Sequence, residues 1–297
     1  RGRVFVEPEG ADFNFDKALE RLTKVFGVIS ISPVYKIESD FDAIKEHSLA
    51  MVKDSVAEKN LVTFKVETKR ANKSFPLESP EVSRDLGEHL LKNIPSLKVD
   101  VNNPSFIFYV EIREHTYLYF EIIPAAGGLP VGTGEKTLLL LSGGIDSPVA
   151  GWMMLKRGVE LEVVHFYSYP YTSERALEKV VDLAKILAQY CISIKLHIVP
   201  FTKIQTEINE KCPENELVLI MRRFMMKIAE KIALSNGALS LTTGESIGQV
   251  ASQTMHSLSV TNAAVAIPVF RPLIGMDKNE VVSIARKIGT FETSILP

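Results

Sequence analysis

The residues with the clearest chemical potential lie in one glycine-rich turn, SGGIDS, at residues 142–147. The turn follows the apolar run TLLLL and precedes a segment of helical periodicity, so we expect a strand, a turn and a helix. Glycines let backbone amides approach an anion, and the amino end of a helix carries positive potential. The pattern therefore predicts a phosphate site formed by Ser142, Gly143, Gly144 and Ser147, with Ser147 also capping the helix.

Asp146 distinguishes this turn from the common phosphate loop. A Walker motif requires GxxxxGK[ST], and the segment has no matching lysine. A carboxylate would repel phosphates unless Mg²⁺ or a particular reaction step required it, so we expect Asp146 to bind Mg²⁺ or to act near the attacked phosphorus. SGGxDS resembles the PP-loop of ATP pyrophosphatases, which cleave ATP between its α- and β-phosphates and adenylylate a substrate. The alternative is an ordinary turn in which Asp146 only complements the helix end.

A second candidate catalytic residue lies near the end of the chain. Asp277 and Glu280 have the spacing of a capping box, which predicts a helix start. Lys278 has no role in that box. An ammonium group at this position could neutralise the charge that develops as pyrophosphate leaves.

After residue 136, predicted strands alternate with predicted helices, and these elements must position the candidate residues. Apolar runs predict strands, and the segments between them predict helices at 147–157, 173–190, 214–236 and 277–288. Apolar strands that alternate with helices predict an α/β fold with a doubly wound parallel sheet, whose ligand lies beyond the carboxyl ends of the strands. The predicted strands are residues 137–141, 160–166, 193–199, 238–243 and 266–270.

Other candidate nucleotide contacts follow from this placement. His165 and Phe166 end the second strand, and Gly244 follows the fourth. Arg222 lies beside the apolar stripe of the 214–236 helix, where the alternative is a solvated arginine with its stem along that stripe. Gln253 is four residues from Gln249, so a helix would place both on one face.

The first part of the chain has a different organisation. Residues 3–6 alternate like a strand, and residues 1–36 are too short to bury a core alone, so we expect a partial N-terminal domain there. Residues 37–124 combine helical segments with the alternating aromatic runs FIFYVEIR and TYLYFEI, which predict a small α+β domain. Glycine and proline in residues 125–136 predict a linker, and residues 137–297 form the catalytic domain.

Together these segments resemble the tRNA 4-thiouridine synthetase (tRNA sulfurtransferase) family. SGGIDSPVAGW carries the PP-loop, and TFKVETKRANKSFP, SRDLGEHLL and YVEIR look like the RNA-binding THUMP domain. LTTGESIGQVASQT and RPLIGMDKNEVV also look like stretches of this family. The resemblance makes residues 1–36 the end of a ferredoxin-like domain.

The resemblance implies an activity. ATP adenylylates O4 of uridine 8 in tRNA, and a persulfide sulfur then displaces AMP to give 4-thiouridine. It implies ATP and Mg²⁺ as cofactors, a cysteine desulfurase as persulfide donor, a homodimer and a possible role in thiamin synthesis. Its sulfur-handling cysteine follows the segment that matches SILP, and both ends of the chain look cut. The ATP contacts it implies are Leu140, Leu141, Ser142, Gly143, Gly144, Ser147, His165, Phe166, Arg222, Gly244 and Gln253.

The same resemblance gives a meaning to a basic cluster in the THUMP-like segment. Lys65, Lys69, Arg70 and Lys73 surround Glu67, and a charge run of this kind is usually a solvated face. On an RNA-binding domain it is the best candidate for contacts to the acceptor end of tRNA.

Bulk composition limits the alternatives. The chain has 297 residues, 46% of them hydrophobic and 24% charged, and a net charge of −2, so any nucleic-acid surface must be local. Two cysteines form no disulfide framework, and the apolar runs fall short of the ~18–20 residues that span a bilayer, which predicts a cytoplasmic protein. Two rival functions remain: another PP-loop adenylylating enzyme acting on RNA, and a non-catalytic RNA-binding protein with structural ATP.

Overall fold

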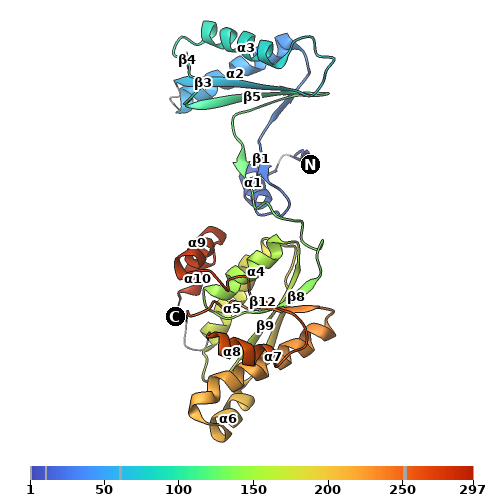
Figure 1. Cartoon of the computed structure of the whole chain (residues 1–297). Coiled ribbons are helices and arrows are strands. Elements are labelled where there is room, and N and C mark those ends of the chain that lie inside the picture. The colour runs from blue at the N-terminus through green and yellow to red at the C-terminus, as the bar shows by residue number, and fades with distance from the viewer. Residues whose placement is uncertain (1, 11, 60–61, 250–252, 297) are drawn as a thin grey trace. The chain divides into compact units, whose positions relative to one another are not determined.

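The computed structural model describes residues 2–10, 12–59, 62–249 and 253–296 (Figure 1). The chain divides into two compact units. One comprises Ser30–Pro124, and the other comprises Arg1–Ile29 together with Ala125–Pro297. Within the described ranges, every helix is too short or too polar to cross a bilayer.

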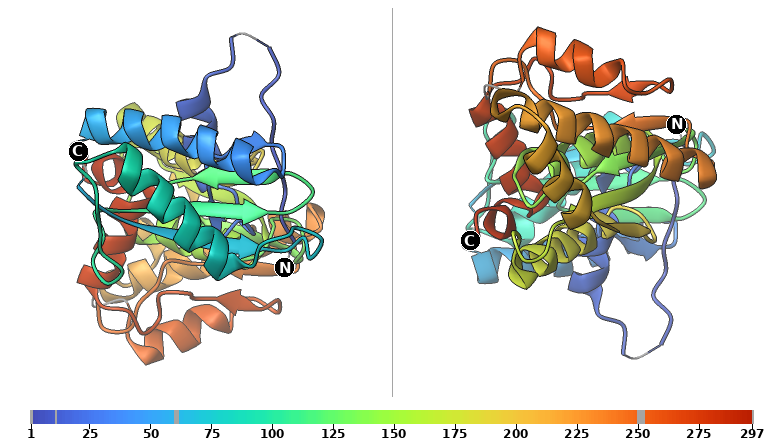
Figure 2. Two further views of the ribbon diagram at one scale, coloured as in Figure 1. Left: turned by 90° about the horizontal axis from the view of Figure 1, so that it is seen from above. Right: turned by 90° about the horizontal axis from the view of Figure 1, so that it is seen from below.

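The Ser30–Pro124 unit is a sheet with two helices on one of its faces. Helices α2 (Phe41–Lys59) and α3 (Ser79–Asn93) lie side by side over the sheet (Figure 2). Buried side chains such as Phe64, Leu86 and Phe108 fill the space between the layers. The strand order is β2 (Tyr35–Ile37), β6 (Thr116–Tyr119), β5 (Phe106–Ile112), β3 (Thr63–Arg70) and β4 (Lys98–Val99), and β1 (Ser30–Ile31) pairs separately with β7 (Ile123–Pro124).

The larger unit contains a five-stranded sheet in which every neighbouring pair is parallel. The chain runs outward from the central strand β8, then returns across it to fill the other side, as the doubly wound prediction requires. The topological switch point therefore lies between β8 and β11, which is where such sheets bind ligands. The order is β10 (Leu196–Pro200), β9 (Glu160–Tyr167), β8 (Lys136–Leu140), β11 (Ser240–Thr242) and β12 (Val269–Phe270).

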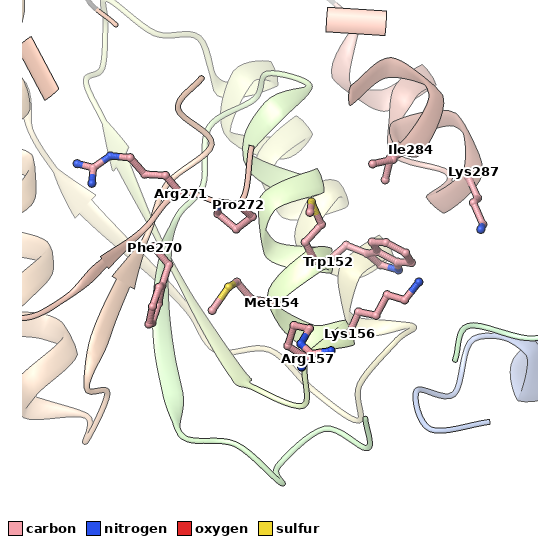
Figure 3. Close-up of a pocket in the computed structure, with 10 residues that line it drawn as sticks. Trp152, Met154, Lys156, Arg157, Phe270, Arg271, Pro272, Ile284 and Lys287 are labelled. Carbon is pink, nitrogen blue, oxygen red and sulfur yellow. The ribbon is translucent and has the colours of Figure 1, made fainter. Parts of the chain in front are cut away.

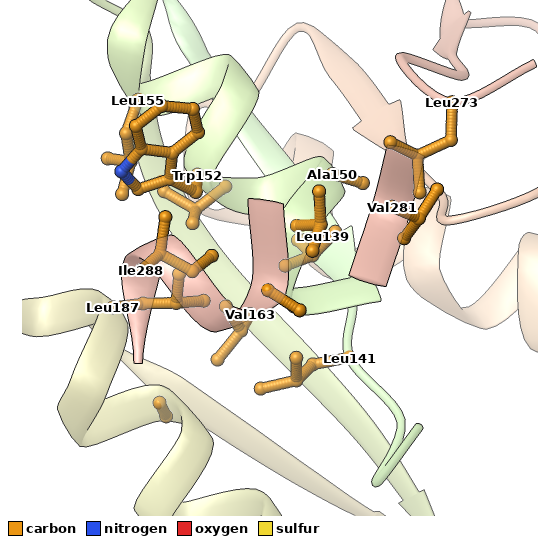
Figure 4. Close-up of a cluster of buried hydrophobic side chains, with 14 of the residues drawn as sticks. Leu139, Leu141, Ala150, Trp152, Leu155, Val163, Leu187, Leu273, Val281 and Ile288 are labelled. Atoms are coloured by element: carbon orange, nitrogen blue, oxygen red, sulfur yellow. The ribbon is translucent and has the colours of Figure 1, made fainter. Parts of the chain in front are cut away.

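Helices cover both faces of this sheet because successive residues of β8 point to opposite sides. Leu139 packs in a core with residues of α4 (Asp146–Lys156), α5 (Glu174–Ala188) and α9 (Lys278–Ile288) (Figure 4). Leu138 packs on the other face against α7 (Leu217–Ser235). The remaining elements are α1 (Phe15–Thr23), α6 (Thr202–Lys211), the 3₁₀ turn η1 (Glu214–Glu216), α8 (Met255–Asn262) and α10 (Phe291–Ser294).

Close packing places α4 directly on the sheet. A Cβ atom on Gly151 would lie 2.7 Å from Cδ2 of Leu139, so only glycine lets the helix approach this closely. Phe26, which follows α1, stacks against Trp152 of α4 and Tyr190 at ring-centroid distances of 5.8 and 5.6 Å. These contacts hold the second half of α4 between the sheet on one side and Phe26 with Tyr190 on the other.

Several local predictions were wrong. Residues 3–6 form no strand, although their side chains alternate. Helix α4 begins one residue early, so its N-cap is Ile145 and Ser147 lies inside the first turn. The capping box of Asp277 and Glu280 is confirmed at α9.

Candidate functional site

The glycine-rich turn is closed by the hydroxyl of Ser147. This buried side chain accepts a hydrogen bond from the Ser142 amide at 2.9 Å and lies 3.1 Å from the Ser142 hydroxyl. The amide of Gly144 donates to the Ser142 hydroxyl at 3.3 Å. Ser147 therefore shapes the turn, which is a different role from the helix cap that the sequence suggested.

Gly244 brings the end of β11 against the start of α4. A Cβ atom here would lie 2.6 Å from the backbone nitrogen of Ser147 and 2.8 Å from the carbonyl carbon of Asp146. Backbone atoms cannot move aside as a flexible side chain can, so glycine is required by space. This contact holds the two edges of the switch point together.

A cavity of about 210 Å³ opens at this switch point. Ser142 and Asp146 line it from the β8 side, Thr243 and Gly244 from the β11 side, and Arg222 from α7. The structure therefore brings together predicted residues from three separate segments. The full lining is Leu140, Ser142, Asp146, Ser147, Arg222, Met225, Met226, Thr243, Gly244, Glu245, Gln253 and Thr261.

Asp146 and Lys278 form an ion pair across the mouth of the turn. Nζ of Lys278 lies 3.0 Å from Oδ1 of Asp146, although 132 residues separate them in sequence. The Gln249 side-chain amide also approaches the carboxylate, at 3.4 and 3.5 Å. Gln253 lines the cavity. Neither Gln249 nor Gln253 is helical, and residues 250–252 between them lie outside the described residues.

Glu245 forms a buried charge cluster that the sequence did not reveal. Its carboxylate pairs with Arg222 and, at 2.7 Å, with Nε of Arg271, and it accepts a hydrogen bond from Thr243 at 2.9 Å. Burial, and secondarily the charge of Arg271, lower the pKa of Arg222, but a guanidinium remains protonated in proteins. The cluster fixes Arg222 at the cavity wall. Arg271 directly follows the carboxyl end of β12, where parallel sheets bind ligands. This position is the one feature of the sequence that could have identified Arg271 as a site residue.

His165 is held in one tautomer by the end of β8. Its Nδ1 lies 3.0 Å from the carbonyl oxygen of Leu141, and a carbonyl only accepts, so Nδ1 carries the proton and Nε2 is an acceptor. Burial lowers the pKa of His165, which keeps the ring neutral at pH 7. Phe166 packs on the α7 face against Phe201, Leu140 lines the cavity, and Leu141 is in the core.

The neutral state of His165 predicts a pH effect. The unfolded chain takes up a proton near pH 6.5, while the folded chain resists it because its pKa is lower, so stability falls as the pH drops below about 6.5. His165→Asn removes this contribution but keeps a donor for Leu141. Urea unfolding between pH 7.5 and 5.5 should show wild type losing more stability than the variant on acidification. Parallel losses would contradict the buried neutral histidine.

The predicted basic cluster of the Ser30–Pro124 unit is divided between two faces of β3. Lys65 and Lys69 share one face, where Lys65 pairs with Glu67 at 2.6 Å. Arg70 points to the other face, donates to the Phe75 carbonyl at 2.9 Å and lies 3.7 Å from Glu78. Lys69 and Lys73 are exposed, whereas Arg70 is mostly buried and supports the turn before α3.

In the unit that contains the parallel sheet, a larger hollow of about 550 Å³ lies between α4 and α9 (Figure 3). Its walls are mainly apolar, as Trp152, Phe270 and Ile284 show, with Lys156 and Lys287 among its basic residues. None of the residues of the glycine-rich turn lines it. The smaller cavity, where the glycine-rich turn, Asp146 and Arg222 converge, is therefore the candidate nucleotide site.

Two family models match the chain. The model described as thiamine biosynthesis protein (ThiI) matches residues 132–297, and the THUMP domain model matches residues 38–121. These spans contain the cavity and the basic strand, respectively.

Curated relatives and a solved structure extend the similarity to the whole chain. Proteins named probable tRNA sulfurtransferase are 67% identical in Acetivibrio thermocellus and 58% identical in Alkaliphilus metalliredigens. These alignments cover 100% and 99% of this chain and 76% and 75% of the relatives. A crystal structure described as a 4-thiouridine synthetase–RNA complex with bound ATP is 45% identical, with a TM-score of 0.90, and the match covers 98% of this chain and 75% of that one.

Proposed function

The chain belongs to the ThiI family of tRNA sulfurtransferases, and from this premise we propose that it uses ATP to convert uridine 8 of tRNA to 4-thiouridine. The observation that carries the proposal is the cavity at the switch point between β8 and β11. There the SGGIDS turn, Arg222 and the Asp146–Lys278 pair meet in one chain with a THUMP domain. The solved relative with RNA and bound ATP supports both ligands.

The nucleotide would lie with its phosphates on the turn. The backbone amide of Gly143 and the amino end of α4 would supply hydrogen bonds and positive potential to the pyrophosphate. Arg222, held in place by Glu245, adds a fixed charge at the cavity wall. Nε2 of His165 and the buried Oε1 of Gln253, which has no hydrogen-bond partner among the described residues, are acceptors suited to the amino group of adenine.

The reaction needs charge to move from the attacked phosphorus to the leaving pyrophosphate. O4 of the uridine attacks the α-phosphorus and pyrophosphate departs. The outer sulfur of a persulfide then attacks C4, and AMP leaves with the former O4. A second thiol of the sulfur donor attacks the inner sulfur, which breaks the S–S bond and releases 4-thiouridine with formation of a disulfide on the donor. Lys278 would neutralise the departing pyrophosphate, and its ion pair with Asp146 would orient that ammonium before the nucleotide binds. The residues also fit Mg²⁺, which typically takes one or two carboxylates and substrate phosphates, with Asp146 as the carboxylate.

Cys191 is poorly suited to carry the sulfur. Burial raises the pKa of Cys191 to about 11, so at pH 7 it is a thiol and a weak nucleophile. We propose a cysteine desulfurase as the persulfide donor, a homodimer as the assembled form, the cytoplasm as the compartment and, as a further use of the same sulfur, thiamin synthesis. Residues 1–36, 37–124 and 137–297 would be the partial ferredoxin-like, THUMP and PP-loop domains, joined by the 125–136 linker.

A thiolation assay tests the proposal. The protein is incubated with unmodified tRNA, MgATP and a persulfide source, and we expect pyrophosphate together with the near-ultraviolet absorption of 4-thiouridine. Pyrophosphate without thiolation would instead support another PP-loop enzyme that adenylylates RNA. Neither product would support an RNA-binding protein with structural ATP.

Contacts between tRNA phosphates and the exposed lysines predict a salt effect. Each phosphate contact adds roughly 0.7–0.9 to the slope of log affinity against log salt, so Lys69→Gln with Lys73→Gln should lower the slope by about 1.4–1.8. The matched control is Lys92→Gln, an exposed lysine of α3 paired with Glu88. Filter binding of tRNA across a salt series measures the slopes. An unchanged slope in the double variant would remove these lysines from the RNA surface.

A further inference from the structure

Lys179 lies against the glycine-rich turn, although it comes from a different element. It projects from α5, and a Cβ atom placed on Gly143 would lie 2.7 Å from its Cε and 3.5 Å from its Nζ. Gly143 has no positive φ, so its backbone does not require glycine. The glycine instead leaves room for the lysine side chain.

The ammonium of Lys179 is held by two carbonyls from a distant segment. Nζ donates to the carbonyl oxygen of Leu296 at 2.7 Å and to that of Ser294 at 3.4 Å. The hydroxyl of Ser294 in turn donates to the carbonyl of Gly144 at 3.4 Å. The lysine, the turn and the segment Ser294–Leu296 thus form one connected unit.

This ammonium is not neutralised within the described part of the chain, where no carboxylate lies within ion-pair distance of it. Carbonyl oxygens carry only partial charge, and an ammonium has three donors. By contrast, the other lysine near the turn, Lys278, is paired with Asp146. Lys179 therefore adds an uncompensated positive charge beside a turn whose amides already suit an anion.

We infer that Lys179 binds the outer phosphates of the nucleotide, supplying from α5 the cation that a Walker loop carries in its own sequence. This inference rests on the proposed nucleotide site and adds a residue to it. The Ser294 and Leu296 carbonyls aim the ammonium at the turn. The β- and γ-phosphates, which leave together as pyrophosphate, are the groups that it would contact, whereas AMP lacks them.

Calorimetric titration of the whole chain with MgATP and with AMP tests the inference. Lys179→Gln removes the charge, while its amide can still donate to a carbonyl of the Ser294–Leu296 segment. We expect it to weaken MgATP binding by about tenfold, the usual scale of a charge-assisted contact, and to leave AMP binding unchanged. Lys179→Arg should retain most of the affinity. The matched control, Lys185→Gln, changes an exposed lysine of the same helix that pairs with Asp182 and should match wild type.

Each outcome has a separate meaning. A Lys179→Gln chain that keeps the wild-type preference for ATP over AMP, or that loses both ligands equally, would overturn the inference about Lys179 alone. A wild-type chain that binds ATP no better than AMP would overturn the proposed phosphate site, and the lysine's role with it. Should Lys179→Gln not fold, Lys179→Met replaces it, since it keeps an unbranched apolar stem, removes the charge and should reduce the ATP preference in the same way.

Discussion

Lys278→Ala is expected to lower the rate of uridine adenylylation by about two to three powers of ten while leaving the fold intact. The ammonium lies 3.0 Å from Asp146, and in the proposed mechanism it stabilises charge that appears only as pyrophosphate leaves. Its loss should therefore reduce kcat much more than it raises KM for ATP. Pyrophosphate release with saturating tRNA across a series of ATP concentrations measures both parameters.

The stability of this variant should change little. Lys278 is half-exposed, and exposed ion pairs contribute about 0–1 kcal/mol to the free energy of unfolding. The start of α9 remains capped by Asp277 and Glu280. Lys287→Ala, an exposed lysine at the other end of the same helix, is the matched control and should retain wild-type turnover. Normal turnover in Lys278→Ala would exclude Lys278 from the chemistry.

Gly244→Ala is the second change with a large expected effect. The new methyl would lie 2.6 Å from the Ser147 nitrogen, so the end of β11 and the start of α4 must move apart. We expect a loss of about 1–3 kcal/mol in the free energy of unfolding and a fall of about a hundredfold in turnover, because the phosphate turn is displaced from Arg222. Urea unfolding and pyrophosphate release measure these two effects.

Gly275→Ala provides the comparison for that variant. A Cβ atom on Gly275 meets nothing within 4 Å, and its φ is not positive, so the substitution adds a methyl without strain. It should behave like wild type in both assays. If Gly244→Ala were equally active, the backbone contact between β11 and α4 would not be needed to form the site.

The sheet was predictable because its signal is local. Apolar runs such as TLLLL and ELEVVHF are typical of strands buried on both faces, and their alternation with helices predicted the parallel, doubly wound sheet. Helix α6 was missed because TKIQTEINEK lies where a strand-to-helix connection was expected and has only one buried residue, Ile208. Residues 3–6 show the opposite error, since alternation alone does not supply a partner strand.

The structure brings several of the predicted site residues together, whereas the contacts among them could not be predicted from the sequence. The sequence motif, the capping pattern and the family resemblance pointed to the turn, Asp146, Lys278 and Arg222. The turn, Asp146 and Arg222 line one cavity. The cluster of Arg222, Glu245 and Arg271 joins segments that are far apart in sequence, so no spacing rule could reveal it. Ser147 was placed at a helix cap because its residue type favours that position, whereas the bond to Ser142 depends on how the turn closes.

The position at which ATP is cleaved tests the central claim most directly. Full turnover with tRNA and a persulfide source, followed by chromatography of the nucleotides, should yield AMP and pyrophosphate in equal amounts, because the turn presents the α-phosphorus to uridine O4. Formation of ADP and orthophosphate would mean that the terminal phosphorus is attacked, and would contradict the assignment of Asp146, Lys278 and the SGGIDS turn to adenylylation.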